Sequence, residues 1–256
     1  MMRRYAVISD IHGNLHALEA VLAEIAGMGI SKIICLGDVV GYGPFPDRCI
    51  DLVIKCCSTA IRGNHDDAVI NPQLEEEFNG PAKVAIAWSR GVLGPLHLDA
   101  LCRLREIEHP HESVMCVHDC PVTAATDYVY DTHIAAIAFG GVNTPICLLG
   151  HTHVPMVFEA PPANDSKGEL AAHDVVAYVT PDGEPIALAQ DRRYICNPGS
   201  VGQPRDADPR ASFAVLDLDQ RTLTVHRTDY DIDAAQLATQ QAGLPTVLAD
   251  RLAIGA

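Results

Sequence analysis

Short runs of β-forming apolar residues in the first 158 residues of this chain repeatedly end in polar side chains. The fragments that follow these runs are Asp10-Ile11-His12, Gly37-Asp38, Gly63-Asn64-His65-Asp66, His118 and Gly150-His151-Thr152-His153. Catalytic groups on an open α/β sheet collect at the carboxyl ends of its strands, so these residues are expected to meet at one edge. Aspartate, histidine and asparagine supply oxygen and nitrogen ligands that borderline divalent metals accept. The pattern therefore predicts an α/β fold that carries a metal site.

The spacing of apolar residues changes from strand-like to helical directly after the first fragment. Residues 5–9 are typical of a buried strand, and the following apolar residues that share one helical face are Leu15, Leu18, Val21, Leu22 and Ile25. Gly27 and Gly29 end this helix, and residues 32–36 form the next strand. The segment is thus a β-α-β unit, for which a right-handed crossover is expected.

The remainder of the first half continues this alternation. A helix is expected over residues 47–57, and residues 73–105 are rich in helix, interrupted by Gly91 and by the Gly94-Pro95 turn. Further strands are expected over residues 58–61, 114–117, 146–149 and 154–158. The motif-bearing half therefore covers residues 1–158.

The second half has a different character. Residues 160–174 are rich in Pro, Asn, Asp and Gly, which predicts a mobile insertion. Five consecutive strands of an antiparallel half (175–230) are expected over residues 175–179, 186–189, 193–196, 212–218 and 222–227. Pro181-Asp182-Gly183 and Asp219-Gln220 are expected at hairpin turns. A C-terminal helix over residues 233–253 should break at Gly243-Leu244-Pro245, and one shared site makes residues 1–256 a single domain.

Charge and apolar runs exclude several classes of protein. The net charge of −15 disfavours the tracking of an extended nucleic acid, which needs clustered Lys and Arg. A small phosphorylated substrate remains compatible, because metal ions dominate the local field in a pocket. The N-terminus lacks the apolar core of a signal peptide, and no apolar run is long enough to span a membrane. Nine cysteines without CxxC spacing favour a reducing, cytoplasmic location.

The ordered fragments resemble the motif set of the calcineurin-like metallophosphoesterases, in particular their bacterial phosphoesterase branch. The resemblance covers residues 5 to 158 and extends weakly through Asn197-Pro198-Gly199-Ser200. It implies a four-layer α/β/β/α sandwich, in which two mixed β-sheets face each other and helices cover the outside. It also implies a metal-dependent phosphoric ester hydrolase that acts on a phosphate mono- or diester, of a small molecule or a nucleotide.

The family roles can be transferred position by position. The first metal would be held by Asp10, His12, Asp38 and His153. The second metal would be held by Asp38, Asn64, His118 and His151, with Asp38 bridging both. A metal-bridged hydroxide would attack phosphorus, His65 would be the general acid, and Asp66 would orient His65. Both ions would be divalent: manganese is favoured, and iron, zinc, cobalt or nickel also suit these ligands.

The fourth fragment departs from the family pattern, because Val117 precedes His118 where many members have Gly. Asp119 either adds negative charge beside the site or is a turn residue, and the nearby Pro121 favours the turn. Cys120 either lines the site or, as the favoured interpretation, packs at the strand end. Neither alternative removes His118 as a ligand.

Four residues are weaker candidates for substrate contacts. Asn14 either helps to bind an anion at the start of the first helix or caps that helix. Tyr42 either contacts substrate or covers its loop. Arg48 and Arg205 are possible phosphate ligands, although a solvated salt bridge with a neighbouring aspartate, Asp206 or Asp208, is the favoured interpretation for Arg205.

Three other functions use the same fold. A nuclease shares the ligands, but the acidic composition counts against it. A phosphoprotein phosphatase shares the metal chemistry but needs a peptide groove. A non-catalytic binding scaffold would be expected to have lost ligands, and no predicted ligand is missing here.

Overall fold

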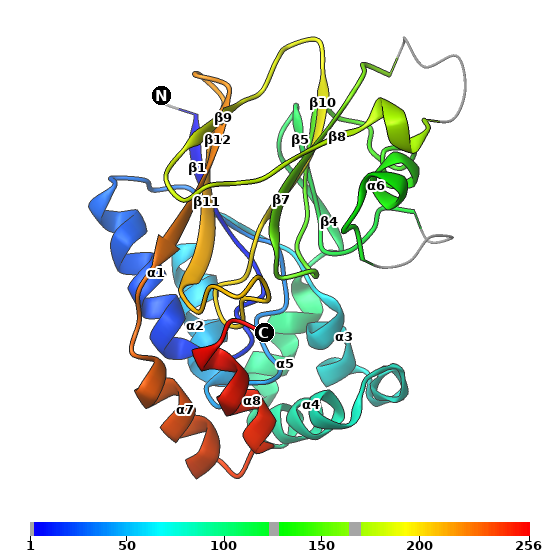
Figure 1. Cartoon of the computed structure of the whole chain (residues 1–256). Helices are drawn as coiled ribbons and strands as arrows, with labels where there is room; N and C mark the ends of the chain where they lie inside the picture. Colours follow the sequence, from blue (N-terminus) through cyan, green and yellow to red (C-terminus); the bar gives the residue numbers. More distant parts are fainter. Residues whose placement is uncertain (1–2, 123–127, 164–169) are drawn as a thin grey trace.

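Two six-stranded β-sheets form the centre of a computed structural model that describes residues 3–122, 128–163 and 170–256 (Figure 1). In spatial order, the first sheet contains β3 (Thr59–Ala60), β2 (Ile33–Cys35), β1 (Arg4–Ile8), β11 (Ala211–Asp217), β12 (Thr222–Thr228) and β9 (Pro185–Ala187). Strands β1, β2 and β3 are parallel, whereas β1, β11, β12 and β9 pair antiparallel in turn. The sheet is therefore mixed.

The second sheet is also mixed. In spatial order it contains β4 (Ile107–His111), β5 (Val114–Val117), β6 (Ile146–Leu148), β10 (Arg193–Pro198), β7 (Pro155–Ala160) and β8 (Val176–Tyr178). Strands β5, β6 and β10 are parallel, and the pairs β4–β5, β10–β7 and β7–β8 are antiparallel.

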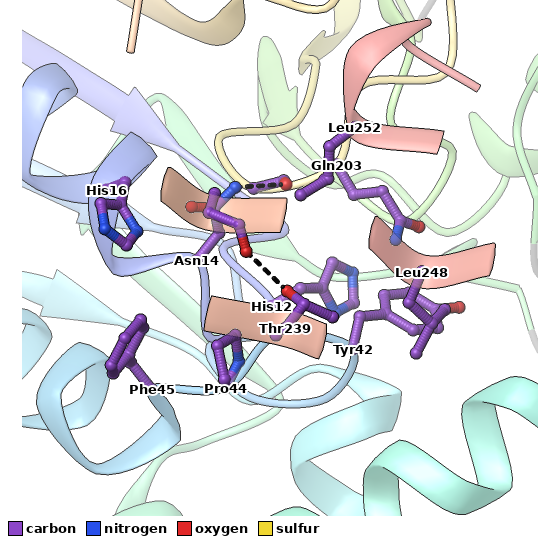
Figure 2. A pocket seen from close by; sticks show the side chains of 13 residues that line it. His12, Asn14, His16, Tyr42, Pro44, Phe45, Gln203, Thr239, Leu248 and Leu252 are labelled. Atoms are coloured by element: carbon purple, nitrogen blue, oxygen red, sulfur yellow. Dashed lines mark hydrogen bonds between the residues drawn. The ribbon is translucent and has the colours of Figure 1, made fainter. Parts of the chain in front are cut away.

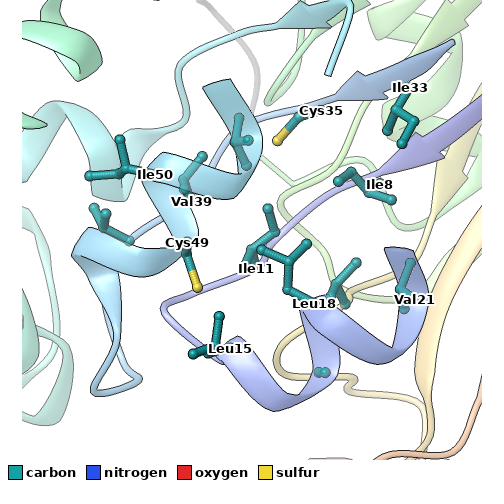
Figure 3. Close-up of a cluster of buried hydrophobic side chains, with 14 of the residues drawn as sticks. Ile8, Ile11, Leu15, Leu18, Val21, Ile33, Cys35, Val39, Cys49 and Ile50 are labelled. Atoms are coloured by element: carbon teal, nitrogen blue, oxygen red, sulfur yellow. The ribbon is translucent and has the colours of Figure 1, made fainter. Parts of the chain in front are cut away.

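Apolar side chains of the two sheets meet in one shared core. Val7 and Leu36 of the first sheet pack in the same cluster as Val114 and Leu148 of the second, and all four are fully buried. Alternate strand residues face outward, so Ile8 lies instead beneath the helices of the outer layer (Figure 3). The predicted four-layer α/β/β/α sandwich is confirmed.

Helices cover the outer face of each sheet. The α-helices are α1 (Leu15–Gly27), α2 (Pro46–Cys56), α3 (Asn64–Ile70), α4 (Gly80–Val92), α5 (Pro95–Arg103), α6 (Thr132–Ala138), α7 (Ile232–Gln241) and α8 (Thr246–Asp250). The short 3₁₀ helices are η1 (Pro72–Glu77), η2 (Ala172–Asp174) and η3 (Arg251–Ala253). Helices α1 and α2 cover the first sheet, and α6 covers the second. None of the helices in the described ranges is long and apolar enough to cross a membrane.

The first helix forms as its sequence predicts. Asn14 caps α1, with its side-chain oxygen accepting a hydrogen bond from the backbone N–H of Ala17 at 3.2 Å. Leu18 and Val21 of the expected apolar face are fully buried against the first sheet. Gly29 has a φ of +68°, the left-handed conformation that ends helices.

Several expected elements differ from the structure. Pro181-Asp182-Gly183 does not join a hairpin, because β8 pairs with β7 in the second sheet and β9 pairs with β12 in the first. Residues 175–230 are likewise not one antiparallel unit, since β10 runs parallel to β6. Alternation of apolar and polar residues shows that a strand exists but does not identify its partner. The Asp219-Gln220 turn does join the antiparallel pair β11–β12.

Three further differences are local. Gly91 does not interrupt a helix, because it lies within α4, which ends at Val92. Strand β4 was not expected, since its sequence, Ile-Glu-His-Pro-His, is poor in apolar residues. The C-terminal helix begins at Ile232, and α7 and α8 are separated at the predicted Gly243-Leu244-Pro245 break.

Only part of the predicted mobile insertion can be compared with the structure. Residues 164–169 lie outside the described residues. At its edges, β7 continues to Ala160, and η2 occupies residues 172–174.

Candidate metal centre

The predicted metal ligands lie just beyond the carboxyl ends of strands in both sheets. Asp10 and His12 follow β1, Asp38 follows β2, and His118 follows β5. The remaining predicted ligands follow β3 and β6 and are Asn64, His151 and His153. These strands are parallel within each sheet and the sheets face each other, so their ends converge at one edge of the sandwich.

Asp10, His12 and His153 form one group of potential metal ligands. Nε2 of His153 lies 3.3 Å from Oδ1 of Asp10 and 3.1 Å from Nε2 of His12. Atoms that share one ion at bond lengths of about 2.1 Å lie about 3–3.5 Å apart, so these separations suit a single metal. Nε2 of His12 also lies 3.6 Å from Oδ2 of Asp38, which borders this group.

Asp38, His118 and His151 form a second group. Within the described residues, the buried side-chain atoms that lack a hydrogen-bond partner include Asp38 Oδ2, Asn64 Oδ1, His118 Nε2 and His151 Nε2. Each unpaired buried polar atom costs about 1–3 kcal/mol, so four at one place need a binding partner. A second divalent ion would satisfy all four. Because Asp38 Oδ2 faces both groups, it fits the predicted bridging position.

Backbone carbonyls hold three of the imidazole rings with Nε2 turned toward the centre. Nδ1 of each ring donates to a backbone carbonyl: His12 to Val40 at 3.1 Å, His118 to Leu36 at 2.7 Å and His153 to Gln203 at 2.6 Å. A carbonyl can only accept, so Nδ1 carries the proton and donates it. When each ring is neutral, the Nε2 lone pair is therefore available to a metal, as second-shell hydrogen bonds commonly arrange.

Unusual backbone conformations concentrate at the same place. Non-glycine residues of the described ranges with positive φ are Asp10, His12, Asp38, Tyr42, His151, His153, Ala207 and Arg221. All but the last two belong to the candidate site. A non-glycine residue in this region costs about 1–3 kcal/mol, and such strain persists where surrounding structure or function requires it. The strain is an indication of function that is independent of the ligand chemistry.

The electrostatics of the centre favour a cation between the carboxylates. Burial raises the pKa of Asp38, but the charges of His118 and His65 outweigh it and hold that pKa well below its usual value. Burial lowers the pKa of His118, but the carboxylates of Asp38 and Asp10 outweigh it and raise that pKa to about 10. The metal-free centre therefore holds a proton on His118, which a metal ion would displace on binding.

His65 lies at the edge of the centre, where its ring contacts other rings. Its centroid is 4.7 Å from that of His12, 4.6 Å from Tyr42 and 4.8 Å from Phe78. Burial lowers the pKa of His65 to about 4. A ring nitrogen of His65 also lies within 4.8 Å of potential ligand atoms of His12 and Asp38. The role of His65 as an acid rather than a metal ligand therefore stays a prediction.

The expected support of His65 by Asp66 is wrong. The Asp66 carboxylate accepts hydrogen bonds from the backbone N–H groups of Val39 at 2.9 Å, Val40 at 3.1 Å and Gly63 at 3.0 Å. Across the ranges that the structure describes, no hydrogen bond joins Asp66 to the His65 ring. Asp66 instead ties the loop after Asp38 to the start of α3, which carries Asn64 and His65.

Asn14 is a structural residue in this arrangement. Its Oδ1 caps α1, and its Nδ2 donates to the carbonyl of Gly202 at 2.9 Å (Figure 2). Both polar atoms of the side chain are therefore used, which supports the capping interpretation and not substrate binding. The same view shows the ring of Tyr42 beside His12, with Leu248 of α8 next to it.

The expected salt bridge of Arg205 to a neighbouring aspartate is also wrong. Asp206 pairs with Arg227, and Asp208 pairs with Arg210. The guanidinium of Arg205 lies instead over the ring of Tyr42, 5.9 Å from its centroid.

An open cleft reaches the centre from the side of the second ligand group. Asn64 and His118 line it together with Arg62, Asp67, Glu106 and Asp119. Cys120 also borders this cleft, while its side chain packs in the apolar cluster under α6, so both interpretations of this residue hold. This cleft is the route by which a ligand can approach the second group.

Sequence reasoning missed the residues that hold the first and last ligand segments. Nδ2 of Asn197 donates to the carbonyl of Gly150 at 2.6 Å and to Oγ1 of Thr152 at 3.0 Å. Oγ of Ser200 donates to the carbonyl of Asp10 at 2.8 Å. The available signal was the Asn-Pro-Gly-Ser turn itself, which begins with the last two residues of β10.

Comparison with known proteins agrees with this geometry. Residues 3–221 match the calcineurin-like phosphoesterase superfamily domain. The chain is 34% identical over 254 residues to an uncharacterized protein of Methanocaldococcus jannaschii, an alignment that covers 98% of this chain and 97% of the relative. It is 24% identical over 236 residues to the phosphodiesterase YfcE of Escherichia coli, covering 85% of this chain and 89% of YfcE.

Solved structures show the same likeness. A metallophosphoesterase from Sphaerobacter thermophilus superimposes with a TM-score of 0.85 at 38% identity, and the match covers 100% of both chains. A hypothetical protein from Pyrococcus horikoshii shares the fold, with a TM-score of 0.77 at 19% identity and coverage of 99% of this chain and 98% of the other. The chain belongs to the calcineurin-like phosphoesterase superfamily of metal-dependent phosphoester hydrolases.

Proposed function

We propose that this protein hydrolyses a phosphate mono- or diester of a small molecule or nucleotide, with two divalent metal ions at the centre described above. The observation that carries the proposal is the set of unpaired buried donor atoms on Asp38, Asn64, His118 and His151, beside the separate group of Asp10, His12 and His153. Manganese is the favoured metal, and the mixed oxygen and nitrogen ligands also suit iron, zinc, cobalt or nickel.

The ligand set leaves the loaded centre positively charged. Asp10 and Asp38 are the carboxylates of the two ligand groups, so two divalent ions are only partly neutralised. When bound, such a pair lowers the pKa of water, supplies the nucleophile and stabilises charge on the phosphoryl oxygens. The burial of these carboxylates limits screening by solvent and strengthens the attraction for an anionic substrate.

His65 is the proposed proton donor to the leaving group. Alkoxide leaving groups are poor unless they are protonated, and general acid catalysis commonly contributes about 10²–10⁴-fold. The ring lies beside the ligand groups, and its Nδ1 is buried without a hydrogen-bond partner in the described part of the chain. Burial lowers the pKa of His65 to about 4, and the charge of Asp38 opposes this only in part. The negative charge of a bound phosphate ester would raise this pKa and so favour the protonated ring that donation needs.

The name of YfcE supports a diester among the substrates to be tested. The acidic composition argues against an extended nucleic acid as substrate. The ligand groups are complete, which argues against a non-catalytic scaffold. A phosphoprotein phosphatase is the other candidate, and a phosphopeptide assay separates it from the proposed activity.

The test is an assay of the purified protein with added manganese against 4-nitrophenyl phosphate, bis(4-nitrophenyl) phosphate and a phosphopeptide. We expect hydrolysis of at least one small ester, and its loss on chelation. Asp38→Asn and His118→Ala should abolish the activity while leaving the fold intact by circular dichroism. Full activity in either variant would show that the metal assignment is wrong.

A further inference from the structure

The guanidinium of Arg205 is held at the centre, and no acidic side chain among the described residues pairs with it. Nη2 donates to the hydroxyl of Tyr42 and to Oε1 of Gln203, both at 3.3 Å, and the backbone N–H of Arg205 donates to the carbonyl of His153 at 3.3 Å. Nε is buried and has no hydrogen-bond partner within the residues described. Because both side-chain partners are neutral, the positive charge of Arg205 is not neutralised by the contacts that hold it.

This charge is close enough to act on the metal ligands. The backbone hydrogen bond from Arg205 to the carbonyl of His153 places Arg205 directly beside a ligand of the first group. The ring of Tyr42, on which the guanidinium lies, is 4.5 Å from the ring of His12 and 4.6 Å from that of His65. Arg205 therefore borders the space between the metal ligands and the predicted acid.

The C-terminal helices hold this arrangement from outside. Leu244 and Leu248 pack with Tyr42 in one apolar cluster, together with Ala82 and Ala85 of α4. The family match ends at residue 221, whereas α7 and α8 lie beyond it. The position of Tyr42, and through it that of Arg205, thus depends on a segment outside the matched domain.

We propose that Arg205 binds a terminal phosphoryl oxygen of the substrate and makes the enzyme prefer monoesters to diesters. This inference rests on the proposed hydrolysis. A monoester has three terminal oxygens and a diester has two. Two metal ions hold two oxygens of a bound phosphate, so only a monoester retains a further charged terminal oxygen for a guanidinium. Tyr42 and Gln203 are positioning residues for Arg205.

The test compares 4-nitrophenyl phosphate with bis(4-nitrophenyl) phosphate for the wild type and for Arg205→Ala. The wild type should have the higher kcat/KM for the monoester. Arg205→Ala should lower that value by about 10- to 100-fold, as expected for loss of a charge-assisted hydrogen bond, and change the diester value by less than about threefold. Equal losses on both substrates, no loss, or a wild type that prefers the diester would overturn the proposal.

Two further variants separate position from charge. Tyr42→Phe removes one hydrogen bond to Nη2 and should lower the monoester value selectively, by less than Arg205→Ala does. Arg103→Ala is the control, because Arg103 is exposed on α5, pairs with Asp99 and should leave both substrates unchanged. A monoester loss in Arg103→Ala as large as in Arg205→Ala would also count against the proposal.

A binding measurement makes the inference independent of turnover. Isothermal titration calorimetry of inorganic phosphate into the zinc-loaded protein should give a Kd about 10- to 100-fold weaker for Arg205→Ala than for the wild type. The zinc content should be equal in both. If the wild type hydrolyses neither ester, the proposed function fails, and this titration still decides whether Arg205 binds phosphate. Equal affinities would show that it does not.

Discussion

Oδ2 of Asp38 and Nε2 of His118 lie 3.3 Å apart as a buried ion pair, and neither atom has a hydrogen-bond partner among the described residues. The two atoms thus face each other at the separation of two ligands of one ion, in the interior of the protein. Nε2 of His12 also lies 3.6 Å from the same oxygen. Asp38 therefore joins the two ligand groups, whereas His118 is grouped only with the second.

This difference predicts distinct metal contents for two variants. His118→Ala should lose the second ion and keep the first, so the bound metal falls from about two equivalents to about one. Asp38→Asn should weaken both ions, because the shared carboxylate is lost. Metal analysis after gel filtration measures both values. Equal metal content in the two variants would contradict a bridging Asp38.

Replacement of His65 should affect turnover and not metal content. His65→Asn removes the predicted acid, so kcat should fall by about 10²-fold or more for phenyl phosphate. The fall should be smaller for 4-nitrophenyl phosphate, whose leaving group needs less protonation. Steady-state kinetics on both esters measure the contrast. If His65 were a ligand instead, the variant would lose metal and the two substrates would be affected equally.

Asp66→Asn should destabilise the protein, since an amide cannot accept all the backbone hydrogen bonds of the carboxylate. Loss of one or two of these buried bonds is expected to lower the free energy of unfolding by about 1–3 kcal/mol in urea. Asp67→Asn is the matched control, because Asp67 is only partly buried and pairs with the side chain of Arg62, so a smaller loss of about 0–1 kcal/mol is expected. A loss of kcat in Asp66→Asn at unchanged stability would instead restore its role beside His65.

The sequence predicted the metal ligands better than it predicted their supports. Asp10, Asp38 and His118 each follow a short apolar run, and a strand places the next residue at its carboxyl end regardless of the rest of the fold. The role of Asp66 depends on the backbone of Val39 and Val40, 27 and 26 residues away. Such long-range hydrogen bonds leave no periodic signal in the chain.

Sheet membership shows the same limit. Strands expected at residues 175–179 and 186–189 correspond to β8 and β9. These two strands belong to different sheets. The Pro181-Asp182-Gly183 turn is compatible with a hairpin and with a connection between facing sheets. Partner choice is decided by packing in the shared core, which single-strand patterns do not encode.

The metal-free protein should lose stability in acid partly through His65. Burial lowers the pKa of this ring to about 4, whereas an unfolded chain has its usual value of 6.5. Between these values the unfolded state binds a proton that the folded state does not, so the contribution of His65 is complete above pH 6.5 and is lost as the pH falls. The free energy of unfolding should therefore fall by about 1.5 kcal/mol from this ring between about pH 6.5 and pH 5.

Comparison with His65→Asn measures that contribution together with its effect on the pKa of His12 and of Asp38, which the charge of His65 lowers. Urea unfolding of both chelated proteins at the two pH values is the measurement. The variant should lose about 1.5 kcal/mol less than the wild type across this interval. Other buried groups also change the free energy of unfolding with pH in both proteins. Burial raises the pKa of Asp10 to about 6, for example, so protonation of Asp10 stabilises the folded state as the pH falls. The same loss in both proteins would show that the His65 ring is protonated as readily in the folded chain as in the unfolded one.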